Sequence, residues 1–445
     1  MKPNAALGHL PGEDGLLLGA GNVLRWMRHG VRHLVEQYRR FGPVYRTRFG
    51  PDPVVSVVDP DLMLQVLRNE DGAYSTALAW WTYFGGLDRD NKSMEMTVTL
   101  DFEPHREARR LLQPAFTPAA TAGYLEILTP MLEAAIVEWQ ARGRVLFKPE
   151  IRRLLATVSS RVFLGADREG PLLDSALRDL WGAPLALTKR RWLSRTWRRA
   201  SAGYRRLYDA LLARVPERRA SGGKDLFSRL CVASRDEVGL ADATLVHLMI
   251  GVLLGAFDTT ASGLASMAYL LCRHPEWQER LRRESQALGC ERLAHADARR
   301  LESCELAWKE TLRLFPVTAH LPRCTLRDVE LGGHKLPAGT YVHLQMPPLM
   351  QDPRWWSEPQ RFDPERFLPG RAEDRAHRAI YMPFGGGAHA CLGVHLAGFE
   401  VKAFWHALLT RCRLRLAPDY AGSHGYRTLG AVSGDVAVAL EPLAG

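Results

Sequence analysis

The stretch that most constrains the fold is residues 383–393, which read PFGGGAHACLG. Three successive glycines let the backbone adopt conformations that a side chain forbids and pass very close to a flat ligand. Apolar residues at 392, 396, 399, 403 and 404 then predict a helix with a buried face, which Cys391 begins. The positive end of a helix dipole favours the thiolate, the form of cysteine that binds metals. The stretch therefore predicts a metal-binding Cys391; the alternative is a glycine-rich turn before a helix that bears an ordinary buried cysteine.

The composition indicates a soluble protein of a reducing compartment. The seven cysteines are odd in number and scattered without paired spacing, which argues against a disulfide framework. No basic segment followed by an apolar run opens the chain, and the longest apolar run, 248–257, is well short of the ~20 residues that a membrane span needs. We therefore expect a cytoplasmic protein with no transmembrane span.

The net charge of +10 suggests nucleic acid, an anionic membrane or an acidic protein as partner. No nucleic-acid motif accompanies the charge, which is dispersed along the chain, so we expect no nucleic-acid partner. The densest basic cluster, residues 189–206, contains Trp192 and Trp197. Two readings of this cluster stay open, a solvated helix face and a contact with a membrane surface.

Periodicity predicts a helix-rich chain with a few short strands. Strands at 44–49 and 54–58 flank a Gly/Pro cluster and indicate a hairpin. Helices are predicted at 103–116, 118–142, 149–164, 197–220, 242–272, 275–288, 301–314 and 391–412, and further strands at 329–331, 341–344, 413–416 and 436–440. No repeat or low-complexity linker divides the chain. The expected fold class is α+β, mostly α, with residues 1–445 forming a single domain.

The cysteine loop resembles the haem-binding loop of the cytochrome P450 family, F-x-x-G-x-[HR]-x-C-x-G. The matching residues are Phe384, Gly387, His389, Cys391 and Gly393. The resemblance implies heme b (iron protoporphyrin IX) as cofactor, with Cys391 as the iron ligand, Phe384 and Gly393 at the cofactor and His389 near a propionate. A thiolate ligand pushes electron density onto iron and favours O–O cleavage. The resemblance also implies a helix-rich prism with small sheets around a buried haem.

Other marks of the family follow in order along the chain. Glu310 and Arg313 match its E-x-x-R helix, and Arg366 lies in a P-E-R-F segment. Glutamate and arginine at i and i+3 share one helix face and can pair. The resemblance implies that Arg366 joins them in a buried charge triad that locks the loop behind the cysteine.

An acid and a hydroxyl, Asp258 and Thr259, directly follow the apolar run 248–257. Such groups are costly to bury without a purpose, and delivery of protons to dioxygen supplies one. The segment around Ala256 resembles the family's oxygen-binding groove, with alanine where glycine is commoner. Asp258 and Thr259 are thus the candidate catalytic residues. The alternative is a helical threonine bonded to its own i−4 carbonyl.

Cationic side chains on separate elements are candidates to hold the haem propionates. His105 and Arg109 lie at i and i+4 and match the family's H-x-x-x-R, and Arg323 matches an arginine that follows the E-x-x-R helix. An arginine fork suits a carboxylate. For any one of them alone, an ordinary surface charge is the simpler explanation.

The resemblance implies a monooxygenase that inserts one atom of O2 into an apolar small molecule. NAD(P)H-derived electrons would come through separate ferredoxin and ferredoxin reductase, or flavodoxin-type donors, docking near Arg106 and Arg110. Family position suggests pocket residues at Trp80, Trp81, Tyr83, Phe84, 181–193, Leu253, Ala256, Phe257, 317–321 and 429–432. The rivals are a peroxide-driven peroxygenase or isomerase and a non-catalytic haem or ligand carrier. The Asp258–Thr259 pair argues against both, since neither needs a proton relay.

Overall fold

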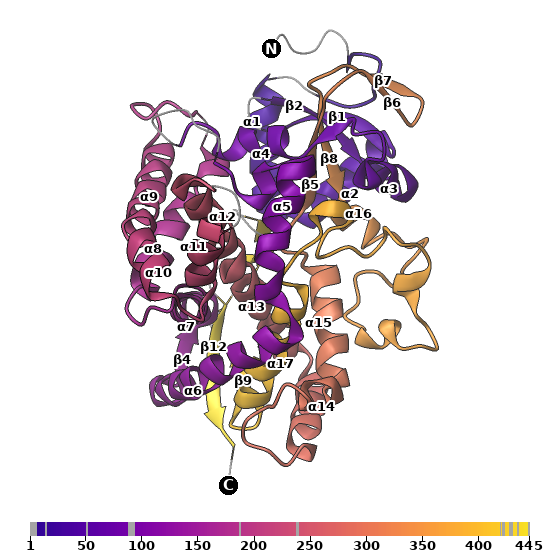
Figure 1. Cartoon of the computed structure of the whole chain (residues 1–445). Coiled ribbons are helices and arrows are strands. Elements are labelled where there is room, and N and C mark those ends of the chain that lie inside the picture. The colour runs from indigo at the N-terminus through magenta and orange to yellow at the C-terminus, as the bar shows by residue number, and fades with distance from the viewer. Residues whose placement is uncertain are drawn as a thin grey trace.

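Helices form most of the computed structural model, and small sheets lie at its edges (Figure 1). The structure describes residues 7–13, 16–49, 52–87, 94–186, 188–236, 240–418, 420, 423–426, 430–433 and 436–443. The helices are α1 Leu16–His29, α2 Val31–Phe41, α3 Pro60–Arg68, α4 Ala77–Phe84, α5 Phe102–Leu112, α6 Pro118–Arg142, α7 Phe147–Leu164, α8 Gly170–Leu180, α9 Arg195–Leu212, α10 Val215–Ser221, α11 Leu226–Asp236, α12 Asp242–Ala256, α13 Asp258–Arg273, α14 Pro275–Ala287, α15 Glu302–Leu314, α16 Met346–Leu349 and α17 Val394–Leu409. The predicted class, α+β and mostly α, is confirmed.

The largest sheet has five strands in the order β1-β2-β8-β5-β3. Its first two strands form the predicted hairpin, with Val44 opposite Val57, and β2 pairs in parallel with β8. A three-stranded sheet, β4-β12-β9, joins residues 144–146 to the C-terminal part of the chain, and β6–β7 and β10–β11 are separate pairs. The strands are β1 Val44–Phe49, β2 Asp52–Val57, β3 Tyr74–Ser75, β4 Arg144–Leu146, β5 His320–Thr325, β6 Val329–Leu331, β7 His334–Leu336, β8 Tyr341–Gln345, β9 Cys412–Leu416, β10 Ser423–Tyr426, β11 Gly430–Ser433 and β12 Ala437–Pro442.

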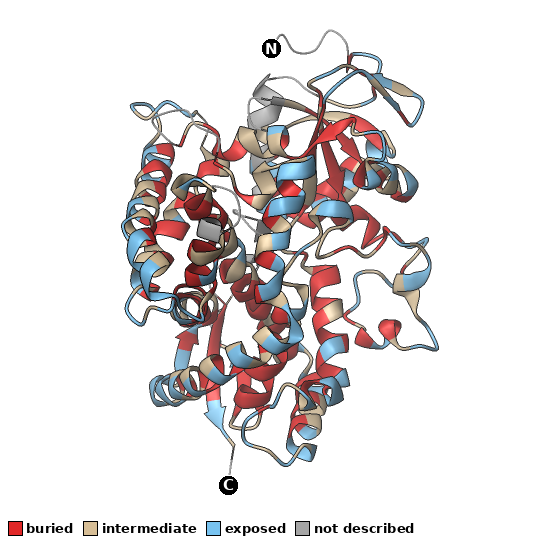
Figure 2. Ribbon diagram, viewed as in Figure 1, coloured by how far each residue is buried: buried red, intermediate tan, exposed pale blue. Residues whose placement is uncertain are grey.

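The core lies around α12, α13, α15 and α17, whose ribbons are mostly buried (Figure 2). By length and composition alone, two helical stretches, Pro118–Arg142 and Asp242–Arg273, could cross a membrane. In the second, 72% of the apolar window is buried inside the protein, and the first packs Leu132, Ile136 and Trp139 into the same core. Apolar faces that pack against each other in this way are typical of core helices in a globular fold.

Two predicted helices are broken in the structure. The predicted helix 197–220 divides into α9 and α10, because Pro216 lies in the first turn of α10 and cannot continue the preceding helix. The predicted helix 242–272 divides into α12 and α13 at Phe257. The second break lies at the candidate catalytic residues.

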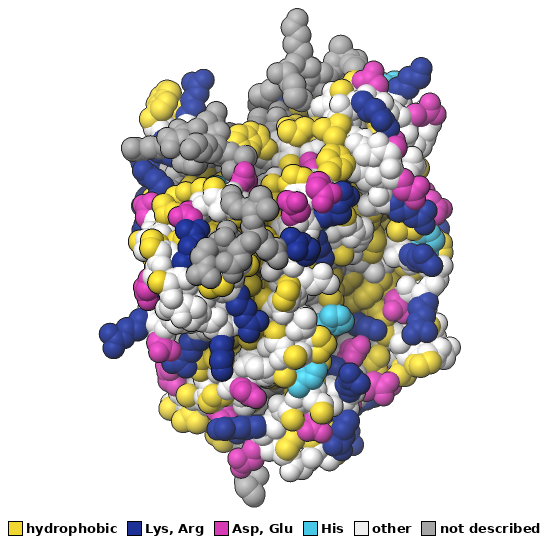
Figure 3. Space-filling view, in the orientation of Figure 1, with side chains coloured by type: hydrophobic (Ala, Val, Ile, Leu, Met, Phe, Trp, Pro, Cys, Tyr) yellow, Lys and Arg dark blue, Asp and Glu magenta, His cyan; other side chains and the backbone are white. Residues whose placement is uncertain are grey.

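The basic segment 189–206 is divided between the interior and the surface. Trp197 is 1% exposed and packs into the core, whereas Trp192 is 74% exposed. Arg199 and Arg206 both pair with Asp179, at 3.1 and 2.9 Å. On the face shown in Figure 3, cations and carboxylates are interspersed, in keeping with the dispersed charge of the sequence.

A buried charge cluster ties α15 to the irregular segment that follows α16. Glu310 accepts two hydrogen bonds from Arg313, at 2.7 and 2.8 Å, and one from Arg366 at 3.1 Å. All three side chains are 0% exposed, which confirms the predicted triad. Glu373 adds a second carboxylate, 2.6 Å from Arg366, so two cations face two anions. The Asp363 amide also donates to Glu310, at 3.0 Å.

Replacing Arg366 by methionine should destabilise the protein strongly. The change leaves the carboxylate of Glu310 short of a partner inside the core, and breaking a buried pair costs about 3–5 kcal/mol. Arg361→Met, at an exposed pair with Glu358, is the control and should cost less than about 1 kcal/mol. Chemical denaturation of both variants provides the measurement, and equal small losses would contradict a structural role for the cluster.

Candidate functional site

A cavity of about 400 Å³ lies where α5, α12, α13, β5, α17 and the cysteine loop meet. Eight of the ten predicted site residues line it: His105, Arg109, Ala256, Thr259, Phe384, His389, Cys391 and Gly393. The other two, Asp258 and Arg323, are not among its lining residues. Residues far apart in the sequence thus share one cavity, although each taken alone had a simpler explanation.

The glycines of the cysteine loop meet two different requirements. Gly385 and Gly387 have φ of 72° and 69°, in the left-handed region that favours glycine. A Cβ on Gly387 would lie 2.3 Å from the Leu67 carbonyl oxygen, so the loop also passes very close to α3. The Cys391 amide donates to the Phe384 carbonyl at 2.9 Å and closes the loop. These contacts fix the direction in which the cysteine faces.

Cys391 does not begin the helix, as the sequence had suggested. The backbone turns at Leu392 and Gly393, and α17 starts at Val394 with Gly393 as its N-cap. Burial raises the pKa of the Cys391 thiol, while the Gly393 amide and Arg109 lower it. The protein alone therefore does not favour the thiolate, and a metal cation bound to the sulfur would supply the missing charge compensation.

Cationic and imidazole groups gather on one side of the cavity. The rings of His105 and His389 stack with centroids 3.8 Å apart, and Arg109 donates to the Ala390 carbonyl at 2.7 Å. Burial lowers the pKa of His105 to about 4, of His389 to about 2 and of Arg323 to about 10. Neighbouring cations lower the pKa of both histidines further, which shows that positive charge is concentrated on this side of the cavity.

This cluster fits the two propionates of a haem. His105 Nε2 is buried without a hydrogen-bond partner, and neither Arg109 nor Arg323 forms an ion pair with a carboxylate among the described residues. Buried polar atoms normally have partners, and an arginine fork binds a carboxylate well. A dianionic ligand would supply the carboxylate partners that these side chains lack. It would lie in the same cavity that Cys391 lines.

The break between α12 and α13 opens the helix beside the cysteine. Thr259 donates to the Gly255 carbonyl at 2.7 Å and Thr260 to the Ala256 carbonyl at 3.3 Å. Side-chain hydroxyls thus bind two carbonyls at the break, an arrangement known to bend helices. A Cβ on Gly255 would meet nothing within 4 Å, so the cavity reaches the backbone there. The back-bonded threonine foreseen as an alternative is present, yet it lies on the cavity wall.

Asp258 points away from the cavity and is 6% exposed. Its carboxylate lies 3.5 Å from Arg152 of α7, which also pairs with Asp174 at 2.8 Å. The acid and the hydroxyl that adjoin in sequence therefore lie on two sides of the same helix turn. Arg152 had no recognisable signal in the sequence.

Only some of the expected pocket residues line the cavity. Trp80, Tyr83, Trp181, Leu185, Ala256 and residues 317–321 line the cavity. Phe84, Leu253 and Phe257 belong to the core instead, with exposures of 2% or less, and Trp81 is not part of the wall. Leu429 lies outside the described residues, as do the side chains of 430–432.

Sequence reasoning missed Glu400, the acidic residue of α17 that lines the cavity. Removal from bulk solvent raises its pKa to about 8, although a hydrogen bond with Thr260 acts the other way. Its one signal in the sequence is an acid within the apolar run from Val394 to Leu409. Glu400 joins α17 to α13, next to the helix break.

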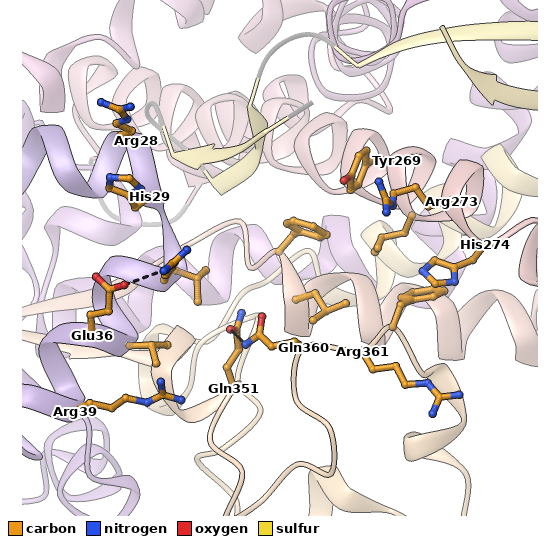
Figure 4. A pocket seen from close by; sticks show the side chains of 17 residues that line it. Arg28, His29, Glu36, Arg39, Tyr269, Arg273, His274, Gln351, Gln360 and Arg361 are labelled. Carbon is orange, nitrogen blue, oxygen red and sulfur yellow. Dashed lines mark hydrogen bonds and ion pairs between the residues drawn. The ribbon is translucent and has the colours of Figure 1, made fainter. Parts of the chain in front are cut away.

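A second and larger cavity, of about 960 Å³, is a groove between α2, the end of α13 and residues 351–362 (Figure 4). Arg28, His29, Arg39, Arg273 and Arg361 line it around an apolar floor, and Arg32 pairs with Glu36 at 3.0 Å. None of the predicted site residues is among its lining residues. The smaller cavity, which holds the cysteine, is therefore the candidate functional site.

Comparison with known proteins agrees with this geometry. The family described as "Cytochrome P450" matches residues 11–428. "Putative cytochrome P450 136" of Mycobacterium tuberculosis is 32% identical, over 99% of this chain and 90% of that protein. "Cyclooctat-9-en-7-ol 5-monooxygenase" of Streptomyces melanosporofaciens is 29% identical, over 92% and 90%. Among solved structures, retinoic acid-bound cyanobacterial CYP120A1 has a TM-score of 0.85 at 22% identity, over 94% of this chain and 96% of that chain, which shows the shared fold.

Replacing Glu400 by glutamine should change how stability depends on pH. The pKa of about 8 exceeds the ordinary 4.5, so the unfolded chain releases this proton at a lower pH than the folded protein. Stability contributed by the protonated carboxyl is complete below about pH 4.5 and is lost as the pH rises to about 8, at up to about 1.4 kcal/mol per unit.

Glu400→Gln keeps a neutral amide in place, so its melting temperature should exceed that of the wild type at pH 8 and converge with it near pH 5. The exposed Glu330→Gln is the control for removal of one carboxylate. A constant difference between Glu400→Gln and the wild type from pH 5 to pH 8.5 would rule out the protonated carboxyl.

Proposed function

The chain belongs to the cytochrome P450 family of haem- and oxygen-dependent monooxygenases, and from this premise we propose that it inserts one oxygen atom from O2 into an apolar small molecule. NAD(P)H supplies the electrons through separate redox proteins. The observation that carries the proposal is one cavity whose wall contains a cysteine, a cluster of cationic and imidazole groups and a broken helix with the Thr259 hydroxyl at the break. We propose further that residues 1–445 form a single domain, since β4 pairs with β12 near the C-terminal end of the chain. We also propose that the protein is cytoplasmic.

The cofactor in this proposal is heme b, with Cys391 as its iron ligand. His105, Arg109, His389 and Arg323 would hold the propionates, and Phe384, Gly393 and Ala256 would border the ring. A thiolate-bound haem supplies cleavage of dioxygen. The Gly393 amide steadies the sulfur, and Arg109 offsets its negative charge.

In the proposed reaction, Thr259 and Asp258 deliver protons. Thr259 lies on the cavity wall with its hydroxyl anchored to the Gly255 carbonyl, so it can hold a proton at a fixed place. Asp258 exchanges protons with solvent when its carboxylate leaves Arg152, which holds it at 3.5 Å. Positioned groups of this kind typically contribute about 10²–10⁴-fold to a rate.

The substrate is an apolar molecule, because aromatic and aliphatic side chains such as Trp80, Trp181, Leu185 and Val317 form much of the cavity wall. The relative named for the 5-monooxygenation of cyclooctat-9-en-7-ol supports a cyclic, largely hydrocarbon skeleton.

A Cys391→Ala variant should lose the thiolate signature of the haem. Reduced wild-type protein with carbon monoxide should show the strongly red-shifted Soret band of a thiolate-bound haem, and the variant should not. Cys412→Ala, a buried cysteine remote from the cavity, is the control and should keep the band. A red-shifted band in Cys391→Ala would exclude Cys391 as the ligand.

Thr259→Ala should uncouple oxygen consumption from product formation while leaving substrate affinity nearly unchanged. The small side chain contributes little to substrate packing, but its loss removes a positioned proton donor. Positioned proton donors typically contribute about 10²–10⁴-fold to a rate, so product formed per NAD(P)H consumed should fall about 10²-fold or more, with hydrogen peroxide released instead.

Ser266→Ala is the matched control, since Ser266 also bonds to an i−4 carbonyl on α13 and lies away from the cavity. If Thr259→Ala and Ser266→Ala form equal amounts of product per NAD(P)H consumed, Thr259 is only a helix residue bonded to its i−4 carbonyl and not a proton donor. Turnover driven by peroxide alone, without redox proteins, would favour the peroxygenase, and ligand binding without any turnover would favour the carrier.

An acidic electron donor should dock against the exposed arginines of α5. Arg106, which pairs with Glu103, and Arg110 lie on the surface beside the predicted propionate anchors. Electron transfer from a ferredoxin or flavodoxin should therefore slow as salt shortens the Debye length, to about 8 Å at physiological strength. Arg106→Gln should show a weaker salt dependence than the wild type, whereas rates that ignore salt would argue for another docking face.

A further inference from the structure

Three polar side chains form a buried cluster in the wall of the cavity. Tyr83 of α4 lies with its hydroxyl 3.1 Å from His320 Nε2 and 3.3 Å from His343 Nε2. The two imidazoles stack with centroids 4.0 Å apart and an angle of 11°. They are diagonal neighbours on the antiparallel strands β5 and β8, because His320 faces Gln345 and His343 faces Pro322, which places them on one face of the sheet.

Only part of this cluster reaches the cavity. Tyr83 and His320 line the wall, whereas His343 lies behind them and is 5% exposed. The surrounding wall is aromatic: Trp80 packs on Tyr83 with centroids 5.5 Å apart, and Trp181 also lines the cavity. The cluster is thus a polar spot in an apolar wall, separate from the elements that carry the cysteine.

The cluster is electrically neutral near neutral pH. Burial lowers the pKa of His320 to about 4 and that of His343 well below its usual range. Each neutral imidazole has one donor and one acceptor nitrogen, and a phenol both donates and accepts. The cluster can therefore exchange hydrogen bonds with a neutral oxygen, but it offers no positive charge to a carboxylate.

We propose that the substrate carries a neutral hydroxyl or carbonyl group on its apolar skeleton, and that Tyr83 and His320 bind this oxygen and so orient the substrate. This inference rests on the proposed function, since it assigns the cavity to a substrate. His343 is a positioning residue, which holds Tyr83 and His320 from behind. A site built to hydrogen-bond a ligand oxygen selects strongly against analogues that lack it.

Isothermal titration calorimetry with matched ligand trios tests the inference on the haem-loaded protein. The trios are 1-adamantanol, adamantane and adamantane-1-carboxylic acid; perillyl alcohol, limonene and perillic acid; and farnesol, farnesene and farnesoic acid. In at least one trio the alcohol should bind about 10-fold more tightly than the hydrocarbon and the acid, the scale of one net hydrogen bond. Tyr83→Phe and His320→Phe should each remove most of this preference without weakening hydrocarbon binding.

Thr97→Val is the matched control, a hydroxyl on the same cavity wall but outside the cluster, and it should keep the preference. Thermal melting and the carbon monoxide spectrum check that each variant is folded and holds haem. An alcohol with no advantage in any trio, or a preference that survives both variants, would overturn the inference. Oxygen-dependent product formation is assayed separately: product without alcohol preference refutes this inference alone, and alcohol preference without product refutes the proposed function alone.

Discussion

The carboxylate of Glu310 organises the part of the chain that ends at the cysteine. It accepts hydrogen bonds from Arg313, Arg366 and the Asp363 amide, all inside the core. The cluster contains two arginines, Arg313 and Arg366, and two carboxylates, since Glu373 also pairs with Arg366. Such charges can be buried only because their donors and acceptors have partners. Residues 350–393 form no α-helix or strand, so this cluster replaces regular structure as the support for the cysteine loop.

Two close contacts on the other side of the cysteine loop also hold it in place. Gly387 lies against the Leu67 carbonyl, and Arg109 reaches from α5 to the Ala390 carbonyl. The helix break at Phe257 completes the cavity. At the break, the hydroxyls of Thr259 and Thr260 bind the carbonyls of Gly255 and Ala256. A rigid loop thus faces a helix whose backbone is locally open, and the chemistry proposed for the site needs both.

Sequence patterns predicted the parts of this arrangement that local rules govern. Helical periodicity placed α6 at its observed bounds, and the charge triad followed from Glu310, Arg313 and Arg366 once the family was recognised. Patterns could not place the start of α17, which depends on the bond from the Cys391 amide to the Phe384 carbonyl. Nor could they foresee the break at Phe257, where an unbroken apolar run predicts a continuous helix.

Side chains that matter only through tertiary contacts were the hardest to predict. Glu400 and His343 acquire their surroundings only when α13 and β5 pack against them. Their perturbed protonation arises from burial, which a single sequence does not reveal.

The pairing of distant segments also sets an order of events during synthesis. The ribosome releases Leu67 and Arg109 hundreds of residues before Cys391, yet the cysteine loop needs both, as well as Glu310. The early helices must therefore wait with apolar faces uncovered while translation continues, a state that invites aggregation or chaperone binding. A cell that makes this protein faster than its prosthetic group arrives would accumulate chains with the cavity already walled but its main ligand missing.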